Sequence, residues 1–450
     1  MSTSPPAPRL FPLVWPLFLE LCLGLAVGLV GTLLAARISD AAGAAFALAN
    51  HVAGTLFILF RIIGAGISVV ITQSLGGNRR EIADATARAA LGASSWIGGF
   101  AALASWLAAA PLLRLMNAPA ELLPLAVPLL QALAPALMLD AWNASMASVM
   151  RAHLRSRDTL AVLVAMQALQ LLLALPLMQH FGLIGYAMAL AASRSLGLGL
   201  HLWLWRARLG IAPKRSDWWR LPRRELAAVL HIGLPGAAEN IAYRLAYMVS
   251  VAVAGHLGAT ALATHAYVSQ LMYFVLLPGL ATGFGAEIVV GHLIGAGRLH
   301  EAHRLVRRAL ARGLLISVCV AGAAWAASPW LLARFSSDAA VIGPGIVLMG
   351  LTVLLEPGRT FNLVVINALR AAGDARYPVM VGAGSMLLVL AGGSWLLGVA
   401  LGWGLVGLWI AYAADEWLRG LMMWRRWARL GWVPHARAAH RRLRAQAAPH

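Results

Sequence analysis

The sequence predicts an all-α integral membrane protein, with twelve transmembrane helices arranged as two parallel six-helix repeats. Hydrophobic residues make up 60% of the 450 residues, charged residues only 12%, and the mean hydropathy is +0.76. Soluble domains average about 25% charged residues, so most of this apolar surface must face lipid or other helices. Apolar stretches of membrane-spanning length recur along the chain, and the second half repeats the order of motifs in the first.

Each predicted span is an apolar stretch of about 20 residues or more, which is the length that crosses the hydrocarbon layer as a helix. The alternating strands that a membrane barrel needs are absent from the sequence. Gly, Pro and Arg clusters, such as residues 74–80, separate the stretches. The six spans of the first half are residues 11–36, 44–75, 89–110, 122–150, 159–179 and 183–205. Those of the second half are residues 227–253, 262–294, 309–327, 342–369, 377–398 and 402–424.

An internal repeat divides these spans into two lobes. The segment Pro-Leu-Phe-Leu-Glu at 16–20 recurs as Pro-Gly-Ala-Ala-Glu at 235–239, and the segment at 181–185 recurs at 403–407. Because six is an even number, both halves enter the membrane from the same side, which makes them parallel repeats. The predicted organisation is an N-lobe at 1–205, a linker at 206–226, a C-lobe at 227–424 and a basic tail at 425–450.

The distribution of Lys and Arg predicts the orientation. The N-terminus, every second loop after it and the tail together carry 28 of the 36 Lys and Arg, whereas the loops on the other side carry three. By the positive-inside rule, both termini and the linker are cytoplasmic in a multi-pass protein of the inner plasma membrane. This pattern accounts for the net charge of +19 without nucleic acid as a partner. Two cysteines, Cys22 and Cys319, exclude a disulfide scaffold or a cysteine-rich metal site.

Several motifs, in order along nearly the whole chain, resemble the MATE (multidrug and toxic compound extrusion) family. They are Pro16 and Glu20 with Val-Gly-Thr at 30–32, Leu-Gly-Ala-Thr-Ala-Leu-Ala-Thr-His at 257–265, Val-Gly-His-Leu-Ile-Gly-Ala-Gly-Arg at 290–298 and Ala-Leu-Arg-Ala-Ala-Gly-Asp at 368–374. The resemblance implies two six-helix bundles that form a V-shaped cavity. It also implies export of organic, often cationic, compounds driven by Na⁺ or H⁺.

Two positions depart from the family's pattern. Gly31 stands where many bacterial relatives carry an aspartate that binds the cation or proton of the N-lobe. Tyr243 stands where several members place the acid of the seventh helix, while Glu239 lies one turn earlier. The coupling site is therefore expected to shift to the C-lobe or to Asp140.

Carboxylates inside the membrane are costly and point to function. The predicted helices contain seven of them, namely Glu20, Asp140, Glu239, Glu287, Glu356, Asp415 and Glu416. They also contain five arginines, namely Arg61, Arg194, Arg244, Arg359 and Arg419. Seven acids against five arginines predict that at least two carboxylates lack a fixed partner. Such a group takes up a proton or binds a cation.

Glu239 is the principal coupling-ion residue that the sequence predicts, because it lies near the middle of its span. Tyr243 and Tyr247 follow at i+4 and i+8 on the same face and are predicted to bind an organic cation through their rings. The alternative is a simple ion pair of Glu239 with Arg244 or with a neighbouring helix.

Glu356 and Asp140 are the further predicted coupling-ion residues, and Asn143 and Glu20 are predicted to contact substrate. Glu356 has Arg359 as a same-helix neighbour, whereas its N-lobe counterpart Asp140 has Asn143. Glycines follow Glu20 on one face, so close helix packing is the alternative there. Arg244, Arg359, Glu287 and Asp415 are predicted to form charge pairs or gates.

The predicted function is secondary active export of organic cations, in exchange for inward H⁺ or Na⁺, by alternating access in a monomer. No cofactor other than the coupling ion is expected, and no metal site. The alternative within the same superfamily is a flippase or exporter of lipid-linked oligosaccharides or metabolites. An intramembrane enzyme is disfavoured because the sequence has no HExxH, GxSxG or P-loop motif.

Overall fold

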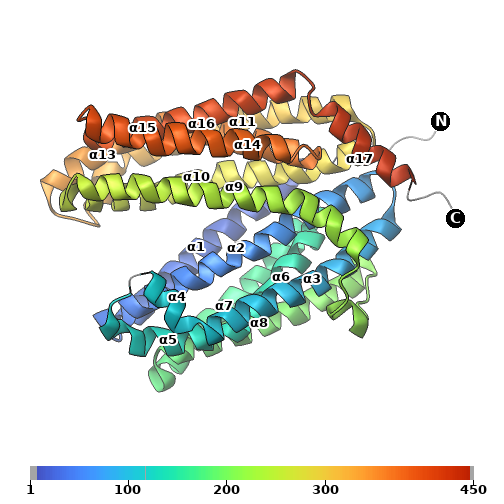
Figure 1. The fold of residues 1–450 in the computed structure, drawn as a ribbon. Helices are drawn as coiled ribbons and strands as arrows, with labels where there is room; N and C mark the ends of the chain where they lie inside the picture. Colours follow the sequence, from blue (N-terminus) through green and yellow to red (C-terminus); the bar gives the residue numbers. More distant parts are fainter. Residues whose placement is uncertain (1–7, 117, 446–450) are drawn as a thin grey trace. The chain divides into compact units, whose positions relative to one another are not determined.

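The computed structural model describes residues 8–116 and 118–445, apart from the side chains of 58, 59, 61–63, 224 and 442–445. The described chain is helical and has no strand (Figure 1). The helices of its first half are α1 (Phe11–Ala36), α2 (Asp40–Gly76), α3 (Arg80–Leu107), α4 (Ala109–Leu115), η1 (Ala120–Leu122), α5 (Leu123–Ala132), α6 (Ala134–Ala152), α7 (Ser156–Phe181), α8 (Leu183–Leu204), η2 (Trp205–Leu209) and η3 (Arg215–Trp218). Those of its second half are α9 (Arg223–His256), α10 (Ala259–Gly295), α11 (Leu299–Ala326), α12 (Ser328–Leu332), α13 (Ala339–Ala371), α14 (Arg376–Ser385), η4 (Met386–Ala391), α15 (Gly392–Trp395), η5 (Leu396–Ala400), α16 (Gly404–Ala428) and α17 (Val433–Ala445).

The twelve predicted spans are confirmed as helices. In the described chain, eight helices are long and apolar enough to cross a membrane, and α5 with α6 adds a ninth span bent by 43°. The helices α2, α9 and α16 complete the set with 37, 34 and 25 residues. At 1.5 Å per residue, each exceeds the hydrocarbon thickness of about 30 Å.

Helical segments also lie outside the predicted spans. The helices α3 and α11 begin nine and ten residues before the predicted starts of their spans, at Arg80 and Leu299. Their first turns continue the helix beyond the apolar stretch. The basic tail contains α17, which follows the fully buried Trp432 and packs Ala436 into the protein.

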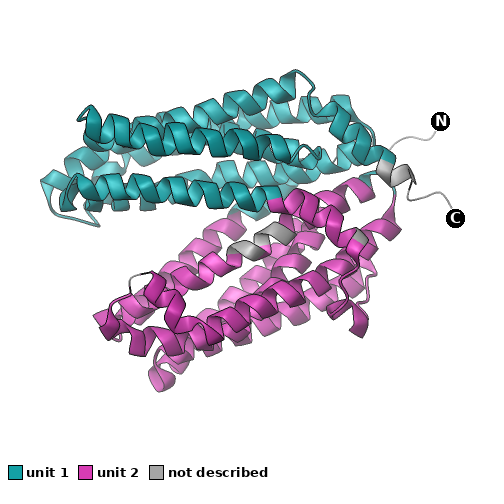
Figure 2. Ribbon diagram, in the orientation of Figure 1, with its two compact units in different colours: residues 1–18, 76–78, 235–450 teal, residues 19–75, 79–234 magenta. Residues whose placement is uncertain are grey.

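The chain forms two compact units (Figure 2). Unit 2 comprises residues 19–75 and 79–234, and unit 1 comprises residues 1–18, 76–78 and 235–450. Within unit 2, α6 packs against α3 and α8; within unit 1, its repeat counterpart α13 packs against α11 and α16, and also against α10. Each unit therefore has one central helix, which carries Asp140 in unit 2 and Glu356 in unit 1, whereas Glu20 and Glu239 lie on α1 and α9.

The backbone turns support the repeat. Asn78, between α2 and α3, has φ 55°, and its counterpart Gly297, between α10 and α11, has φ 74°. This left-handed conformation is easy for glycine and tolerated by asparagine. The same unusual conformation at equivalent positions indicates that both halves make the same turn.

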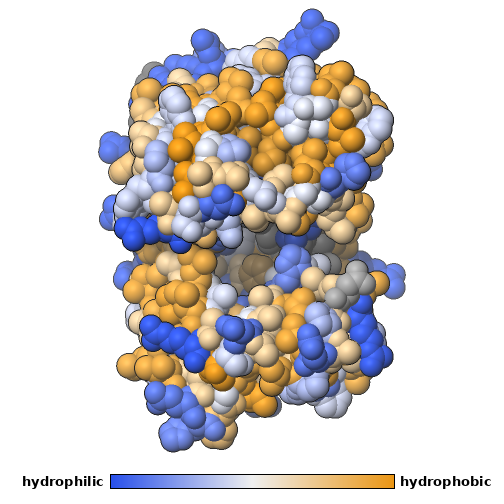
Figure 3. All heavy atoms as spheres, turned by 90° about the vertical axis from the view of Figure 1, so that its left-hand side faces the viewer, coloured by the Kyte–Doolittle hydropathy of each residue, from blue (hydrophilic) through white to orange (hydrophobic). Residues whose placement is uncertain are grey.

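Figure 3 looks onto one end of the helices, where apolar and hydrophilic residues are mixed. Large exposed apolar side chains also lie along the helices. The exposed residues include large groups on spanning helices, such as Phe100 on α3, Leu172 on α7 and Leu388 in η4. Contiguous exposed apolar surface of this kind is rare in soluble monomers. It is the surface expected of a protein whose helices face lipid.

Candidate functional site: two buried charge clusters

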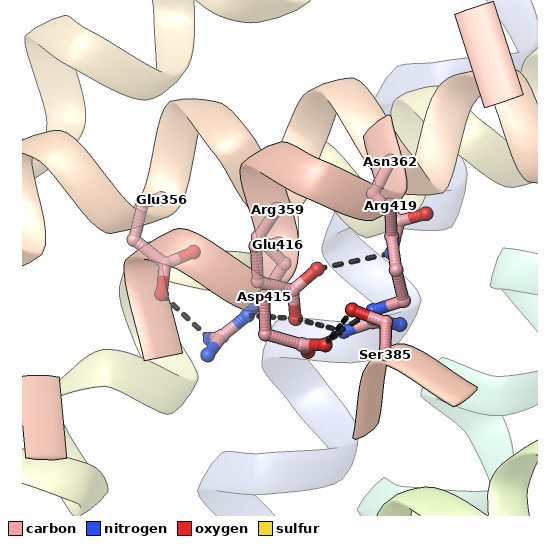
Figure 4. Close-up of polar contacts among 7 residues, drawn as sticks. All are labelled: Glu356, Arg359, Asn362, Ser385, Asp415, Glu416 and Arg419. Carbon is pink, nitrogen blue, oxygen red and sulfur yellow. Dashed lines mark hydrogen bonds and ion pairs between the residues drawn. The ribbon is translucent and has the colours of Figure 1, made fainter. Parts of the chain in front are cut away.

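The central charge cluster of unit 1 joins α13 to α16 (Figure 4). The Nη1 atom of Arg359 donates to Oε1 of Glu356 at 2.6 Å, and its Nε donates to Oε1 of Glu416 at 3.3 Å. Arg419 lies 2.9 Å from Glu416 and 2.7 Å from Asp415. Five charged side chains thus alternate in sign along one chain of contacts.

Neutral side chains complete this cluster. Asn362 donates to Oε2 of Glu416 at 3.0 Å, and Ser385 of α14 donates to Asp415 at 2.5 Å. Glu356 differs from the other acids, because its side chain is 0% exposed and its Oε2 has no hydrogen-bond partner in the described chain. A buried carboxylate oxygen without a hydrogen-bond partner is costly, and this atom is an acceptor that no described donor satisfies.

A second ion pair extends the cluster. Arg370, in the last turn of α13, donates to Oε2 of Glu239 on α9 at 2.6 Å. Glu239 also interacts electrostatically with Arg419. Together these groups contain four carboxylates (Glu239, Glu356, Asp415 and Glu416) and three guanidinium groups (Arg359, Arg370 and Arg419). With every group ionised, the described cluster carries one excess negative charge.

The aromatic residues near Glu239 have other partners. Tyr243 and Tyr247 stack with ring centroids 6.2 Å apart, and Tyr247 donates to Ser269 at 3.2 Å. The ring of Tyr247 also lies near His265 and Tyr412. Among the described residues no hydrogen bond joins Glu239 to either tyrosine, and the binding of an organic cation to the two rings stays a prediction.

The unit 2 cluster is smaller and balanced. Arg194 of α8 lies 2.6 Å from Asp140 of α6, and Arg151 lies 3.2 Å from Glu20 of α1. Thr159 also donates to Glu20 at 2.5 Å. These two acids and two arginines carry no net charge when all are ionised. The Glu20–Arg151 pair mirrors Glu239–Arg370, because each joins the first helix of a repeat to the central helix.

The prediction of at least two unpaired carboxylates is therefore wrong. Six of the seven acids form ion pairs with arginine, and Glu287 is buried in α10 with an interaction of its own. The prediction compared seven acids with five arginines and left out Arg151 and Arg370, which it assigned to loops. The structure places these two arginines in the last turns of α6 and α13, where they form ion pairs with Glu20 and Glu239. Arg244 is exposed and forms no ion pair with any described residue. The side chain of Arg61 lies outside the described residues.

A cavity of about 230 Å³ lies within unit 2, beside the Asp140–Arg194 pair. Its polar lining further includes Gln167, Gln170 and Tyr186. The Oε1 atoms of both glutamines are buried without a partner among the described residues. These glutamines were missed in the sequence, although two amides three residues apart in an otherwise apolar helix are a signal of a polar lining.

Glycines in the lining leave part of this cavity unfilled. An added Cβ at Gly24, Gly28 or Gly54 would meet no atom within 4 Å. Neither Glu20 nor Asn143 lines the cavity. The substrate contacts predicted for these two residues stay predictions. Asn143 instead donates to the carbonyl of Arg194 at 2.9 Å and contacts His201 at 3.0 Å.

The surroundings of Gly31 leave little room for a larger side chain. A Cβ at Gly31 would lie 2.9 Å from the hydroxyl oxygen of Tyr186 and 3.1 Å from Phe46. The Tyr186 hydroxyl accepts a hydrogen bond of 2.9 Å from Gln170. A tyrosine ring therefore occupies the space that a carboxylate side chain would need.

Comparisons with known proteins agree with this architecture. The family model named MatE matches residues 16–175 and 235–395, once in each half. The uncharacterized transporter YisQ of Bacillus subtilis is 30% identical over 94% of each chain. The probable multidrug resistance protein NorM of Pseudomonas aeruginosa is 28% identical over 42% of this chain and 40% of its own.

Solved structures show the same fold. A MATE protein in a bent conformation superposes with a TM-score of 0.87 at 17% identity, covering 96% of both chains. A MOP superfamily transporter from Pyrococcus furiosus, described as having a binding pocket of reverse polarity, gives a TM-score of 0.86 at 19% identity over 95% of this chain and 96% of its own. At such identities, the likeness concerns the fold alone.

Proposed function

Because this chain belongs to the MatE family of membrane transporters, we propose that it exports small organic cations in exchange for H⁺ or Na⁺ that enters through the charge cluster of unit 1. It acts as a monomer by alternating access, with both termini in the cytoplasm, as the distribution of Lys and Arg predicts. The name of its NorM relatives, probable multidrug resistance protein, supports a substrate range of drug-like compounds.

The excess carboxylate of unit 1 carries this proposal. A buried cluster with four acids and three guanidinium groups reaches neutrality when it binds one proton or one monovalent cation. The unpartnered Oε2 of Glu356 is the acceptor that such an ion would use. Glu239, which the sequence ranks first, is held by Arg370 and becomes a secondary coupling residue.

The cavity of unit 2 is the proposed substrate subsite. Asp140 and the two free amide oxygens of Gln167 and Gln170 supply acceptors for a positively charged or N–H-bearing ligand. The one described guanidinium in the lining, Arg194, is neutralised by Asp140 at 2.6 Å. The cavity therefore offers no unpaired positive charge for a pyrophosphate group, which disfavours the flippase alternative.

The proposal is tested by transport in proteoliposomes. Several fluorescent organic cations are offered under imposed Na⁺ or pH gradients, with collapsed gradients as the control. We expect one of the two gradients to drive cation movement against its concentration difference. Movement that is indifferent to both gradients, or that occurs only with anionic compounds, would contradict the proposed exchange.

Filling the cavity of unit 2 is expected to impair transport. In Gly28→Leu the new side chain enters open space and occupies volume that a substrate needs. We expect cation export to fall by about tenfold or more, since small steric changes in a binding pocket have effects of this size. The measurement is the initial export rate at matched protein amounts.

The matched control is Gly199→Leu. Gly199 also has no atom within 4 Å of an added Cβ, but it is exposed on α8 and does not line the cavity. Export is expected to stay at the level of the unmodified protein. Equal rates for the two variants would remove the cavity from the transport route.

A further inference from the structure

An exposed basic stripe lies at the start of α11, outside both charge clusters. It consists of Arg304, Arg307, Arg308 and Arg312, all of which are exposed. None of the four forms an ion pair with any described residue, whereas the nearby Glu301 pairs with Arg298 at 2.7 Å. At 100° per residue, which follows from 3.6 residues per turn, the four guanidinium groups share one side of the helix.

The same side of α11 becomes apolar one turn further on. Leu315, Ile316 and Val318 are 66%, 46% and 44% exposed, and Cys319 is exposed beside them. The helix has 28 residues, so its length of about 42 Å exceeds the hydrocarbon layer by about 12 Å. When the apolar residues from 309 onward face the acyl chains, Arg304, Arg307 and Arg308 lie at the level of the lipid headgroups. Arg312 lies about one turn deeper, and its long side chain can extend back to that level.

The equivalent surface of unit 2 differs in composition. With the repeat offset that pairs Glu20 with Glu239, the stripe corresponds to Ala85, Arg88, Ala89 and Ala93 on α3. Three of the four arginines are thus absent from the other repeat. A positive-inside signal shared by both halves does not explain this difference.

The equivalent surface of unit 2 is also covered by the chain itself. Trp96 donates from Nε1 to the carbonyl of Trp219 at 3.0 Å, and an added Cβ at Gly92 would lie 2.0 Å from the carbonyl of Arg220. The counterparts of Trp96 and Gly92 on α11 are Leu315 and Ala311, and both are exposed. The linker segment covers α3, and no described segment covers the basic stripe.

We propose that the basic stripe of α11 binds the phosphate groups of anionic phospholipids in the leaflet on the side of the chain termini. Guanidinium groups bind phosphate through paired N–H donors, and the apolar residues that follow provide a surface for the acyl chains of the same lipids. The occupant is a lipid because the charged and apolar halves form one continuous face at the right depth.

The experiment measures lipid retention by the full-length protein, independently of transport. Protein is released from nanodiscs that contain phosphatidylglycerol and phosphatidylcholine, and the bound lipids are counted by native mass spectrometry. The test variant is Arg304→Gln/Arg308→Gln/Arg312→Gln. The control is Arg206→Gln/Arg208→Gln/Arg215→Gln, which removes three exposed charges from the linker region. Thermal unfolding in phosphatidylcholine alone shows whether each variant is folded.

We expect the unmodified protein and the control to retain phosphatidylglycerol in preference to phosphatidylcholine. The test variant should bind phosphatidylglycerol about tenfold more weakly than the control, given that each basic residue near a membrane surface contributes to anionic-lipid attraction. Equal losses in both variants, or no loss in either, would overturn the proposal. Competition by soluble glycerol 3-phosphate at the strength of the whole lipid would overturn it too, because it would show an anion site rather than a lipid surface.

Discussion

Glu356→Gln is expected to abolish gradient-driven transport while leaving membrane insertion intact. The change preserves the shape of the side chain and removes the excess negative charge of the unit 1 cluster, so the cluster no longer needs a proton or cation to become neutral. A ligand biases a conformational equilibrium only by its different affinity for the two states. Without a coupling ion that difference disappears, and we expect export to fall about a hundredfold.

Transport of a fluorescent cation in proteoliposomes, under the gradient that drives the unmodified protein, measures this effect. Passive exchange of substrate in the absence of a gradient should persist in Glu356→Gln, which separates loss of coupling from loss of fold. Asp140→Asn is the companion variant in unit 2, where the two ion pairs carry no excess charge. Because Asp140 lines the proposed substrate subsite, this variant is expected to weaken passive substrate exchange as well, which distinguishes it from Glu356→Gln. Normal coupling in Glu356→Gln together with loss in Glu239→Gln or Asp140→Asn would assign the ion to one of those residues instead.

Arg359→Met is expected to destabilise the protein strongly. Arg359 lies between Glu356 at 2.6 Å and Glu416 at 3.3 Å, so its loss leaves two buried carboxylates with less compensation. Removing one partner of a buried ion pair costs about 3–5 kcal/mol. The unfolding midpoint in detergent, measured by thermal or denaturant titration, should fall accordingly.

A double variant and a matched control sharpen this prediction. Adding Glu356→Gln to Arg359→Met removes one uncompensated charge and should restore part of the lost stability, which appears as a coupling energy in a double-mutant cycle. Arg244→Met removes an exposed arginine that has no ion pair among the described residues, so its effect should stay within about 0.5 kcal/mol. A cycle without coupling energy would show that Arg359 stabilises the fold through packing rather than through charge.

The membrane-spanning helices and the two-repeat organisation could be predicted from local features of the sequence, namely apolar length and repeated motifs. The helices α1 and α13, with 26 and 33 mostly apolar residues, are long enough to cross the bilayer whatever their neighbours are. Asp415, for which a charge pair or gate is predicted, forms an ion pair with Arg419, which lies one helical turn away. The functional roles assigned to individual acids stay predictions.

The sequence alone does not show which residues belong to each charge cluster. Glu239 pairs with Arg370, which lies 131 positions away and was counted as a loop residue. The glycine at position 31 was visible in the sequence, but the close approach of the Tyr186 ring to it was not. The helix α17 was missed because its sequence is basic, whereas its position depends on Trp432 packing against Trp427 with ring centroids 4.2 Å apart.

By itself, the sequence determined that this protein is helical, spans a membrane and consists of two related halves, because apolar length and repeated motifs are properties of neighbouring residues. Only the tertiary structure decided that unit 1 carries an excess carboxylate and that unit 2 is balanced. An arginine side chain is long enough to reach an acid on another helix, so the partner of a buried charge depends on which helices pack together. The charge balance of a cluster is therefore a property of the packed helices, and the site proposed for the coupling ion depends on it.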